Sequence, residues 1–418
     1  MSVIMEKVNI HLENRSISRF FFIFLWIMYA VVYMTKNCFG SALAMIVSEG
    51  VLTKSQTGLI NGMFYVVYAP LQVVGGVLAD KYSPEKLLKF GLIGAAFVNI
   101  IIFFNHNYYV MLIVWTLNAV IQTPIWPSVF KIVSSQLVRS DRTNMVFFIS
   151  FSATFGLLLG YIVAAFIRDW QYNFLVSAIA LLVCLVILQL FCSKLNLYMK
   201  PDKKVMPEKK ASVSKIPAIK LFAMSGLFLL LPGVLIRTMI EQGTRTLSPT
   251  MLMELYDNVS PFVGNMLNTL IILSGILGMA LLKFVLYPRF IKNEVKGMFI
   301  MLLLCLPFSI ILRFVGTISV SVAMFALCGI SIVIGSHNLL MAYYNMSFIN
   351  YGKNATAAGI TNAAGSFGIM LESYGFLYVA EKYSWNTVTT SWTGMIIGIM
   401  ILTAIAIPLY TKFKNNNS

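Results

Sequence analysis

The chain contains a succession of apolar stretches that are each long enough to cross a lipid bilayer. A membrane-spanning helix needs about 20 apolar residues, and about twelve stretches of the 418-residue sequence reach that length. Hydrophobic residues make up 59% of the sequence and charged residues 11%, whereas a soluble domain carries about a quarter charged residues. The sequence therefore predicts an all-α membrane protein. The predicted transmembrane helices lie at residues 19–44, 56–79, 87–104, 108–132, 144–167, 172–193, 218–247, 260–286, 296–315, 318–346, 355–379 and 387–411.

One long polar segment divides these predicted helices into two sets of six. It contains Lys-Pro-Asp-Lys-Lys and Pro-Glu-Lys-Lys, a composition that cannot bury a core. We therefore expect an N-terminal six-helix half at 1–192, a cytoplasmic linker loop at 193–217 and a C-terminal six-helix half at 218–418.

Lysine and arginine concentrate at both termini and in alternate connections between the predicted helices. Cytoplasmic connections carry such an excess, so both termini are predicted to be cytoplasmic in a multi-pass protein of the plasma (inner) membrane. The excess of lysine and arginine that gives the chain its net charge of +16 is explained by this topology. It indicates contact with anionic lipid headgroups, not nucleic acid, and we expect a monomer.

No motif of covalent chemistry accompanies these helices. The five cysteines have no CxxC spacing, and the three histidines form no ligand cluster, so neither a disulfide framework nor a metal site is indicated. A phosphate-cradling glycine loop or ATP-binding motif is also absent from the sequence. We expect a protein that is not an enzyme, needs no cofactor or metal, and draws its energy from gradients.

Charged residues stand out in the first apolar run of the C-terminal half. Arg237, Glu241 and Arg245 are spaced four apart, which places them on one face of a helix. Charge at membrane depth is expensive and is functional by default. The first helix of the N-terminal half carries its own isolated cation, Lys36.

These two cations predict a site for a small anion. Transporters built from two halves bind near the bilayer midplane where the halves meet, and a bound dianion would neutralise Lys36 and Arg237 there. Arg237 can grip phosphate oxygens bidentately, whereas Lys36 supplies a compact charge. In the alternative interpretation Lys36 extends to the outer interface and Arg237 pairs permanently with Glu241.

A glycine-rich turn between the second and third predicted helices resembles the cytoplasmic signature of the major facilitator superfamily. Its sequence is Gly-Gly-Val-Leu-Ala-Asp-Lys, ending at Lys81. The resemblance implies the twelve-helix major facilitator fold with two pseudo-symmetric halves, and a gating role for Gly76, Asp80 and Lys81. In the alternative interpretation these charges simply face the cytosol.

Four further islands resemble the organophosphate:phosphate antiporters, the family of glycerol-3-phosphate and hexose-phosphate transporters. In the first helix Lys36 aligns with the family's substrate-binding arginine, and Tyr29 and Tyr33 align with its tyrosines. Tyr68 matches a cavity tyrosine in the second helix. Trp126 stands in a turn similar to the family's glutamine-rich turn, and an island in the eleventh helix resembles the family's threonine, two alanines and glycine. These aromatic residues can also pack between helices or sit at the membrane interface.

The sequence also departs from this family. Ala153 stands about where the family has a substrate histidine, and His337 lies near a family tyrosine. Counting from the start of the seventh helix puts Arg237 at the second substrate arginine, whereas counting back from Ser248 puts Glu241 there. An extra turn between the two anchors would explain both counts, and charge favours Arg237 as the ligand.

Several polar residues are candidates for coupling or counter-charge. Glu241 is expected to pair with Arg237 or Arg245 and is a possible proton site. Glu372 is an intramembrane acid that is either protonated and coupled to transport or paired near the outer end of its helix. His337 is expected to contact the substrate, to transfer protons or to form a structural hydrogen bond.

These features predict a secondary active transporter of a small organic anion. The resemblance implies a sugar phosphate or glycerol phosphate, exchanged for inorganic phosphate by alternating access. Two alternatives stay open: a proton-coupled symporter or exporter of another organic anion, and a transporter-like membrane sensor of a phosphorylated sugar.

Overall fold

The structure is a computed structural model that describes residues 10–12, 14–138, 140–195, 199–201, 217–314, 316–348, 351 and 353–415. Two residues of the predicted gating motif, Asp80 and Lys81, have side chains outside the described part, although the backbone there is helical.

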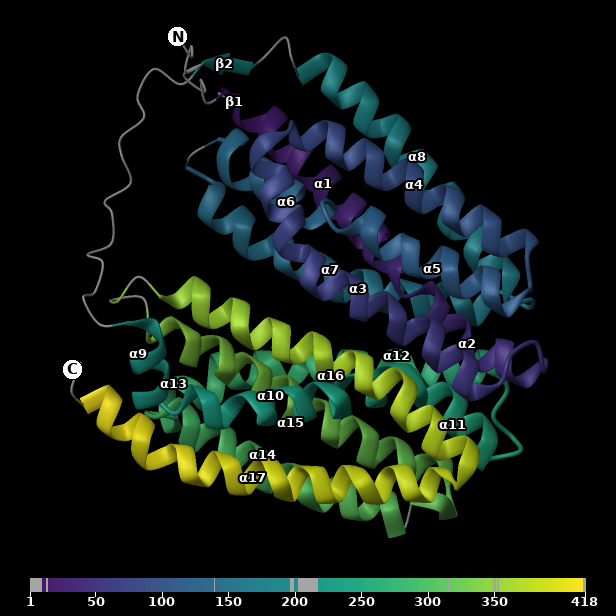
Figure 1. The fold of residues 1–418 in the computed structure, drawn as a ribbon, viewed down its shortest axis with the longest axis vertical. Coiled ribbons are helices and arrows are strands. Elements are labelled where there is room, and N and C mark those ends of the chain that lie inside the picture. The colour runs from purple at the N-terminus through teal and green to yellow at the C-terminus, as the bar shows by residue number, and fades with distance from the viewer. Residues whose placement is uncertain are drawn as a thin grey trace. The chain divides into compact units, whose positions relative to one another are not determined.

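Helices dominate the described chain, and two short strands form one antiparallel sheet (Figure 1). The elements before the central polar segment are β1 (Ile10–Leu12), α1 (Arg15–Lys36), α2 (Cys38–Ser48), α3 (Lys54–Lys81), α4 (Pro84–Phe104), α5 (Tyr108–Gln122), α6 (Ile125–Lys131), the π-helical turn η1 (Ile132–Gln136), α7 (Arg142–Phe166), α8 (Gln171–Leu195) and β2 (Met199–Pro201). The elements after it are α9 (Ala218–Met224), α10 (Leu227–Gln242), the π-helical turn η2 (Gly243–Leu247), α11 (Ser248–Leu255), α12 (Pro261–Leu281), the π-helical turn η3 (Leu282–Leu286), α13 (Tyr287–Phe290), α14 (Glu294–Phe314), the 3-10 turn η4 (Gly316–Ile318), α15 (Val320–Met346), α16 (Asn354–Lys382) and α17 (Trp385–Asn415).

Every predicted transmembrane stretch is helical, but the number of spans is only partly supported. Within the described ranges, nine helical stretches are long and apolar enough to cross a membrane. The predicted spans 56–79, 144–167 and 355–379 coincide with α3, α7 and α16 and are not among them. In α16, for example, Gly, Ala, Ser, Thr and Asn replace large apolar residues. The all-helical fold class is confirmed, whereas the count of twelve is not fully confirmed.

Residue contacts divide the chain into two compact units. Unit 1 comprises Met1–Ala42 and Pro70–Glu208, and unit 2 comprises Leu43–Ala69 and Lys209–Ser418. One boundary between them falls inside α3 at Pro70, where the helix lacks a backbone N–H donor. The division at 193–217 that the sequence suggests stays a prediction.

Unit 1 is built around α1 and α4. α1 packs against α7 and α8, and α4 packs against α5, α6 and α8. The core includes the fully buried side chains Leu25, Leu92, Ile149 and Leu188.

Residues 10–12 of β1 pair with residues 199–201 of β2, a strand pair that the sequence did not predict.

An ion cluster joins the starts of α1 and α7 in unit 1. Arg15 donates from Nε and Nη2 to the Asp141 carboxylate at 3.0 and 2.7 Å, and Arg19 Nε donates to it at 3.0 Å. The guanidinium groups, Arg15 first, hold the pKa of Asp141 well below its usual range. Asp141 is therefore charged at neutral pH and links the two helix ends.

Unit 2 packs its long helices side by side. α15 lies against α12 and α14, and α10 lies against α16 and α17 (Figure 1). Hydroxyl groups fasten α15 to α12, because Ser331 donates to the carbonyl of Ile271 at 2.7 Å and Ser336 donates to that of Gly278 at 2.8 Å. Small residues and interhelical hydrogen bonds are the usual means of helix association in membranes.

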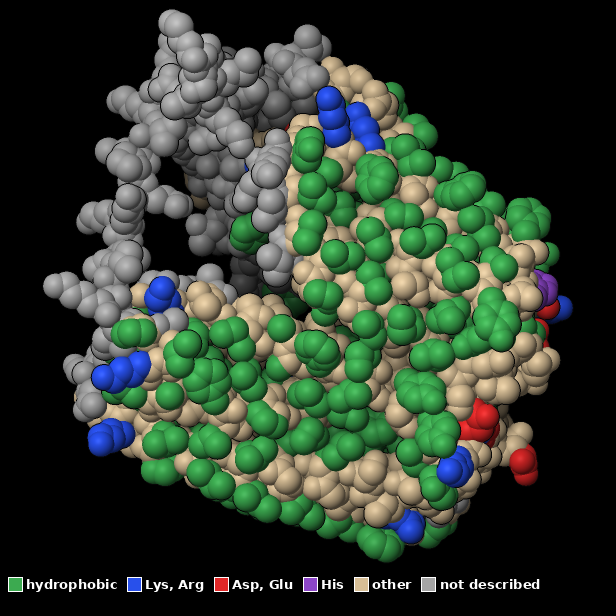
Figure 2. All heavy atoms as spheres, in the orientation of Figure 1, with side chains coloured by type: hydrophobic (Ala, Val, Ile, Leu, Met, Phe, Trp, Pro, Cys, Tyr) green, Lys and Arg blue, Asp and Glu red, His purple; other side chains and the backbone are tan. Residues whose placement is uncertain are grey.

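The outer faces of the helices are apolar. Along α8, Ile179, Val183, Val186 and Leu190 follow one another on one face, and each is more than half exposed. Figure 2 shows hydrophobic side chains spread over the described helices, with charged side chains near helix ends. Such faces suit lipid tails, as a membrane protein requires.

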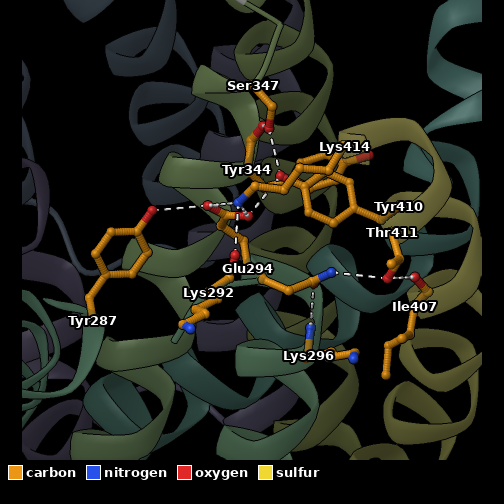
Figure 3. Close-up of polar contacts among 11 residues, drawn as sticks. Tyr287, Lys292, Glu294, Lys296, Tyr344, Ser347, Ile407, Tyr410, Thr411 and Lys414 are labelled. Atoms are coloured by element: carbon orange, nitrogen blue, oxygen red, sulfur yellow. Dashed lines mark hydrogen bonds and ion pairs between the residues drawn. The ribbon is translucent and has the colours of Figure 1, made fainter. Parts of the chain in front are cut away.

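A buried carboxylate anchors the last helix of unit 2 (Figure 3). Glu294 accepts hydrogen bonds from Tyr287 Oη at 2.9 Å and from Tyr410 Oη at 2.8 Å. Lys414 Nζ lies 3.0 and 2.9 Å from its two oxygens. This cluster ties α13, α14 and α17 together, and nothing in the spacing of its members along the sequence predicts it.

We expect Lys414→Gln to lower the stability of the protein by on the order of 1 kcal/mol. The loss stays modest because the Lys414 side chain is 40% exposed and water screens the pair. Thermal unfolding in detergent measures it. Lys412→Gln is the matched control, since Lys412 lies on the same helix and forms no ion pair with the described residues. Equal unfolding temperatures for the two variants would contradict the assignment.

Candidate functional site

The predicted charged residues of the C-terminal half lie on one continuous helical segment of unit 2. α10 carries Arg237 and Glu241, and the π-helical turn η2 that follows carries Arg245. The three side chains are 7, 9 and 13% exposed. Charges this deep need partners, since an unpaired buried ion is strongly unfavourable.

Glu241 pairs with both arginines at once. Its Oε2 contacts Arg237 Nη1, and its Oε1 lies 2.9 Å from Arg245 Nη1. Arg237 also donates from Nη2 to Thr238 Oγ1 at 2.9 Å. The sequence left open which arginine Glu241 would take, and the structure gives it both. One acid between two bases leaves a net charge of +1 in the cluster.

The π-helical turn and its neighbours position Arg245. A π turn widens the helix and disturbs its regular backbone hydrogen bonds, and here the carbonyl of Arg245 accepts from Asn268 Nδ2 of α12 at 2.6 Å. Gly275 of α12 leaves room for the guanidinium. A Cβ added at Gly275 would lie 2.9 Å from Ser331 Oγ and 3.2 Å from Arg245 Nη2.

Several buried polar atoms around this cluster have no hydrogen-bond partner among the described residues. They include Nε of Arg237, Nε of Arg245 and both ring nitrogens of His337. His337 is 3% exposed and comes from α15, which packs against α10 and η2. Buried polar groups are normally satisfied, so a group of them beside a net positive charge suits a polar, anionic ligand.

Four predicted site residues lie together in unit 1. Lys36 ends α1, is 6% exposed, and has its Nζ 5.2 Å from the centre of the Tyr33 ring. The Tyr29 ring packs against Tyr33 at 5.8 Å and against Trp126 at 4.8 Å. The helix is interrupted directly after Lys36, where Asn37 caps it and donates from Nδ2 to the carbonyl of Tyr33 at 2.7 Å.

The other predicted residues lie apart from these two groups. Tyr68 belongs to unit 2 and stacks on Phe64 at 5.4 Å. Glu372 is buried in α16 and accepts a hydrogen bond from Ser373.

In the predicted gating motif, no heavy atom lies within 4 Å of a Cβ built at Gly76, whereas one built at Gly75 would collide with Thr123. The close helix approach is therefore made at Gly75. The side chains of Asp80 and Lys81 lie outside the described residues.

The structure adds residues that the motifs did not single out as site residues. Thr238 and Asn268 hold the cluster, and Gly275 makes space for it. The pair Gly275 and Gly278, spaced three apart in α12, was the only signal in the sequence. The π turn carries no sequence signature that would have revealed it.

Comparison with known proteins gives a consistent picture. The family model described as Major Facilitator Superfamily matches residues 25–372. The chain is 29% identical over 140 residues to the membrane sensor protein UhpC of Salmonella typhimurium, which covers 34% of this chain and 32% of that protein. It is 25% identical over 147 residues to a probable hexose phosphate transport protein of Chlamydia pneumoniae, 35% of this chain and 32% of that protein. The chain thus spans about a third of the length of the curated relatives that it matches.

Solved structures share the fold at low identity. A bacterial homologue of the human lysosomal transporter Spinster, in an inward-facing and unoccupied conformation, has a TM-score of 0.72 and 14% identity, and covers 96% of this chain and 98% of its own. The nucleoside transporter NupG, as a D323A mutant, has a TM-score of 0.70 and 13% identity, with coverages of 92 and 99%.

Gly275→Ala should disturb the cluster. Because the new methyl group would press on Ser331 and Arg245, we expect overpacking to cost about 1–3 kcal/mol and lower the unfolding temperature. Gly394→Ala in α17 is the control, since no heavy atom lies within 4 Å of a Cβ built there and alanine favours the helix. A Gly275→Ala protein as stable as the Gly394→Ala protein would show that Gly275 does not make this space.

Proposed function

The chain belongs to the major facilitator superfamily, and from that premise we propose that it is a secondary active transporter of a small phosphorylated metabolite. The favoured substrate is a sugar phosphate or glycerol phosphate, exchanged for inorganic phosphate by alternating access. The protein is a multi-pass membrane protein. We propose the plasma membrane as its location, with both termini in the cytoplasm.

The observation that carries this proposal is the Arg237–Glu241–Arg245 cluster with its net positive charge. In this structure Glu241 pairs with both arginines. A phosphate group carries up to two negative charges and accepts bidentate hydrogen bonds from arginine, so it can replace Glu241 as the partner of Arg237. The Nε atoms of both arginines and the imidazole of His337, which have no hydrogen-bond partner among the described residues, supply further contacts.

Glu241 gives this exchange of partners its reversibility. An arginine without any counter-charge would hold a dianion too tightly for turnover and would destabilise the empty site. With Glu241 present, the substrate gains only the difference between its own interaction and that of the carboxylate. A transporter needs such a balance because the ligand must leave on the other side of the membrane.

Lys36 is the proposed second ligand, in unit 1. Its burial near Tyr29, Tyr33 and Trp126 supports a site with rigid aromatic walls around one cation. Aromatic rings with polar edges suit sugar or glycerol hydroxyls. Tyr68 stays a candidate for contact with the hydroxyl groups of the substrate.

Names of relatives support a phosphorylated sugar as ligand and raise a second candidate function. The Chlamydia pneumoniae relative is named a probable hexose phosphate transport protein, and the Salmonella typhimurium relative is named a membrane sensor protein. A sensor would bind the same ligand and pass a signal to a partner without net transport.

Uptake by the purified protein in vesicles separates these functions. Vesicles loaded with inorganic phosphate should take up labelled glucose 6-phosphate or glycerol 3-phosphate, and vesicles without internal phosphate should not. A sensor would bind the labelled compound without uptake. Uptake that follows a pH gradient and ignores internal phosphate would instead indicate a proton-coupled symporter.

Arg237→Lys should weaken phosphate binding by about 1–3 kcal/mol, because lysine cannot make the bidentate contact. Inhibition of substrate binding by inorganic phosphate measures the loss. Arg289→Lys is the matched control, since Arg289 is exposed at a helix end. Equal phosphate affinities in the two variants would remove Arg237 from the site.

A further inference from the structure

Glu372 is a buried carboxyl group that forms no ion pair with any described residue. Its side chain is 0% exposed, its Oε2 accepts from Ser373 Oγ at 3.1 Å, and its Oε1 has no hydrogen-bond partner among the described residues. The buried acids Glu241 and Glu294 each have a cation at hydrogen-bond distance. Burial without a cation strongly disfavours the charged form of a carboxyl group.

No described side chain on the helices around Glu372 forms an ion pair with it. The helical segments against α16 are α10, η2, α15, α17 and the beginning of α3. Their charged and titratable side chains, together with those of α16 itself, are Arg237, Glu241, Arg245, Cys328, His337, Tyr343, Tyr344, Lys54, Tyr65, Tyr68, Tyr410, Lys412, Lys414, Tyr374, Tyr378, Glu381 and Lys382. Within the described ranges, none of them forms an ion pair with Glu372.

Glu372 lies where the beginning of α3 packs on α16, inside unit 2. A Cβ added at Gly58 would collide with the carbonyl oxygen of Ser373, so the two helix backbones nearly touch. Asn61 Nδ2 donates to Ser373 Oγ at 3.1 Å, and Ser373 in turn donates to Glu372. The carboxyl group therefore ends a hydrogen-bond chain that crosses this helix contact.

Further polar contacts hold the first turn of α3. Ser55 donates from N and Oγ to Glu381 Oε2, each at 2.6 Å. Lys54 Nζ lies 2.5 Å from Glu254 Oε2, which also accepts from Trp385 Nε1 at 2.8 Å. These contacts are exposed or partly exposed and yield to water readily, whereas the contact at Glu372 is dry.

We propose that Glu372 is a proton-binding site that controls the release of residues 54–62 of α3 from α16. With the proton bound, the carboxyl group is neutral and the dry contact persists. When the contact opens, water enters, and the proton leaves Glu372 for that water as the carboxylate forms. The charged group then resists closure until a proton returns, so the opening of this contact is linked to pH.

Coupling to transport extends this inference and rests on the proposed function. Under that function, release of the beginning of α3 is part of alternating access, and a proton gradient biases the exchange. The control of the helix contact by Glu372 stands independently of any substrate.

Hydrogen–deuterium exchange of the full-length protein in detergent tests the contact. In the pH range where opening of the contact releases the proton of Glu372, the equilibrium constant for opening should increase about tenfold per pH unit. After correction for intrinsic exchange rates, residues 54–62 should therefore exchange faster with rising pH. Glu372→Gln, which is permanently neutral, should keep these amides protected across the range.

Asp257→Asn is the control, since Asp257 is an exposed acid outside this contact, and it should behave as the unchanged protein does. If Glu372→Gln does not fold, Glu372→Met tests the same loss of the titrating group. Protection of residues 54–62 that is independent of pH in the unchanged protein, or an equal pH dependence in the neutral variant, would overturn the proposal.

A transport measurement tests the coupling separately. Phosphate-loaded vesicles that contain the unchanged protein should exchange radiolabelled inorganic phosphate at a rate that depends on pH differently from vesicles with Glu372→Gln. The titration of phosphate is common to both, so the ratio of the two rates isolates Glu372. A ratio that is constant with pH would refute coupling, whereas no exchange in either protein would refute the proposed antiport and leave the test by hydrogen–deuterium exchange in force.

Discussion

The cost of placing charge in an apolar medium governs this structure. Glu294 is buried and has Lys414 and two tyrosine hydroxyls, and Glu241 is buried between two arginines. Both satisfy the rule that a buried ion needs a partner. Glu372 has no cation at hydrogen-bond distance among the described residues, and this difference is the reason that we propose a change of its protonation during function. The three acids have the same chemistry, and only their neighbours assign them different roles.

The fold could be predicted from the sequence because it depends on composition over long stretches. Runs of about 20 apolar residues leave the backbone no partner but its own helix, and the structure confirms a helix at each predicted stretch. The family resemblance and the expectation of a non-enzyme are confirmed by the superfamily match. The predicted number of twelve membrane spans is not fully confirmed, because α16 contains small and polar residues where α8 contains Leu, Val and Ile.

The partners inside the site could not be predicted to the same degree. Four-residue spacing placed Arg237, Glu241 and Arg245 on one face, but the spacing is the same on both sides of Glu241 and cannot choose between the arginines. The contacts of Asn268 with Arg245 and of Lys414 with Glu294 join residues 23 and 120 positions apart. Such contacts depend on how helices pack, which no local pattern encodes. The roles of the predicted site residues therefore stay predictions.

The π-helical turn η2 bears on the disagreement between the two alignments of this helix. It lies between Glu241 and Ser248, and Gly226 in the left-handed region breaks the helix on the other side of Arg237, so both irregularities lie between the two anchors of the counts. One π turn inserts about one residue, less than the four that separate Arg237 from Glu241. A single π turn therefore does not account for the whole offset between the two counts. The register therefore leaves both Arg237 and Glu241 near the family's arginine position, and the positive charge of Arg237 is the reason that it stays the proposed ligand of an anion.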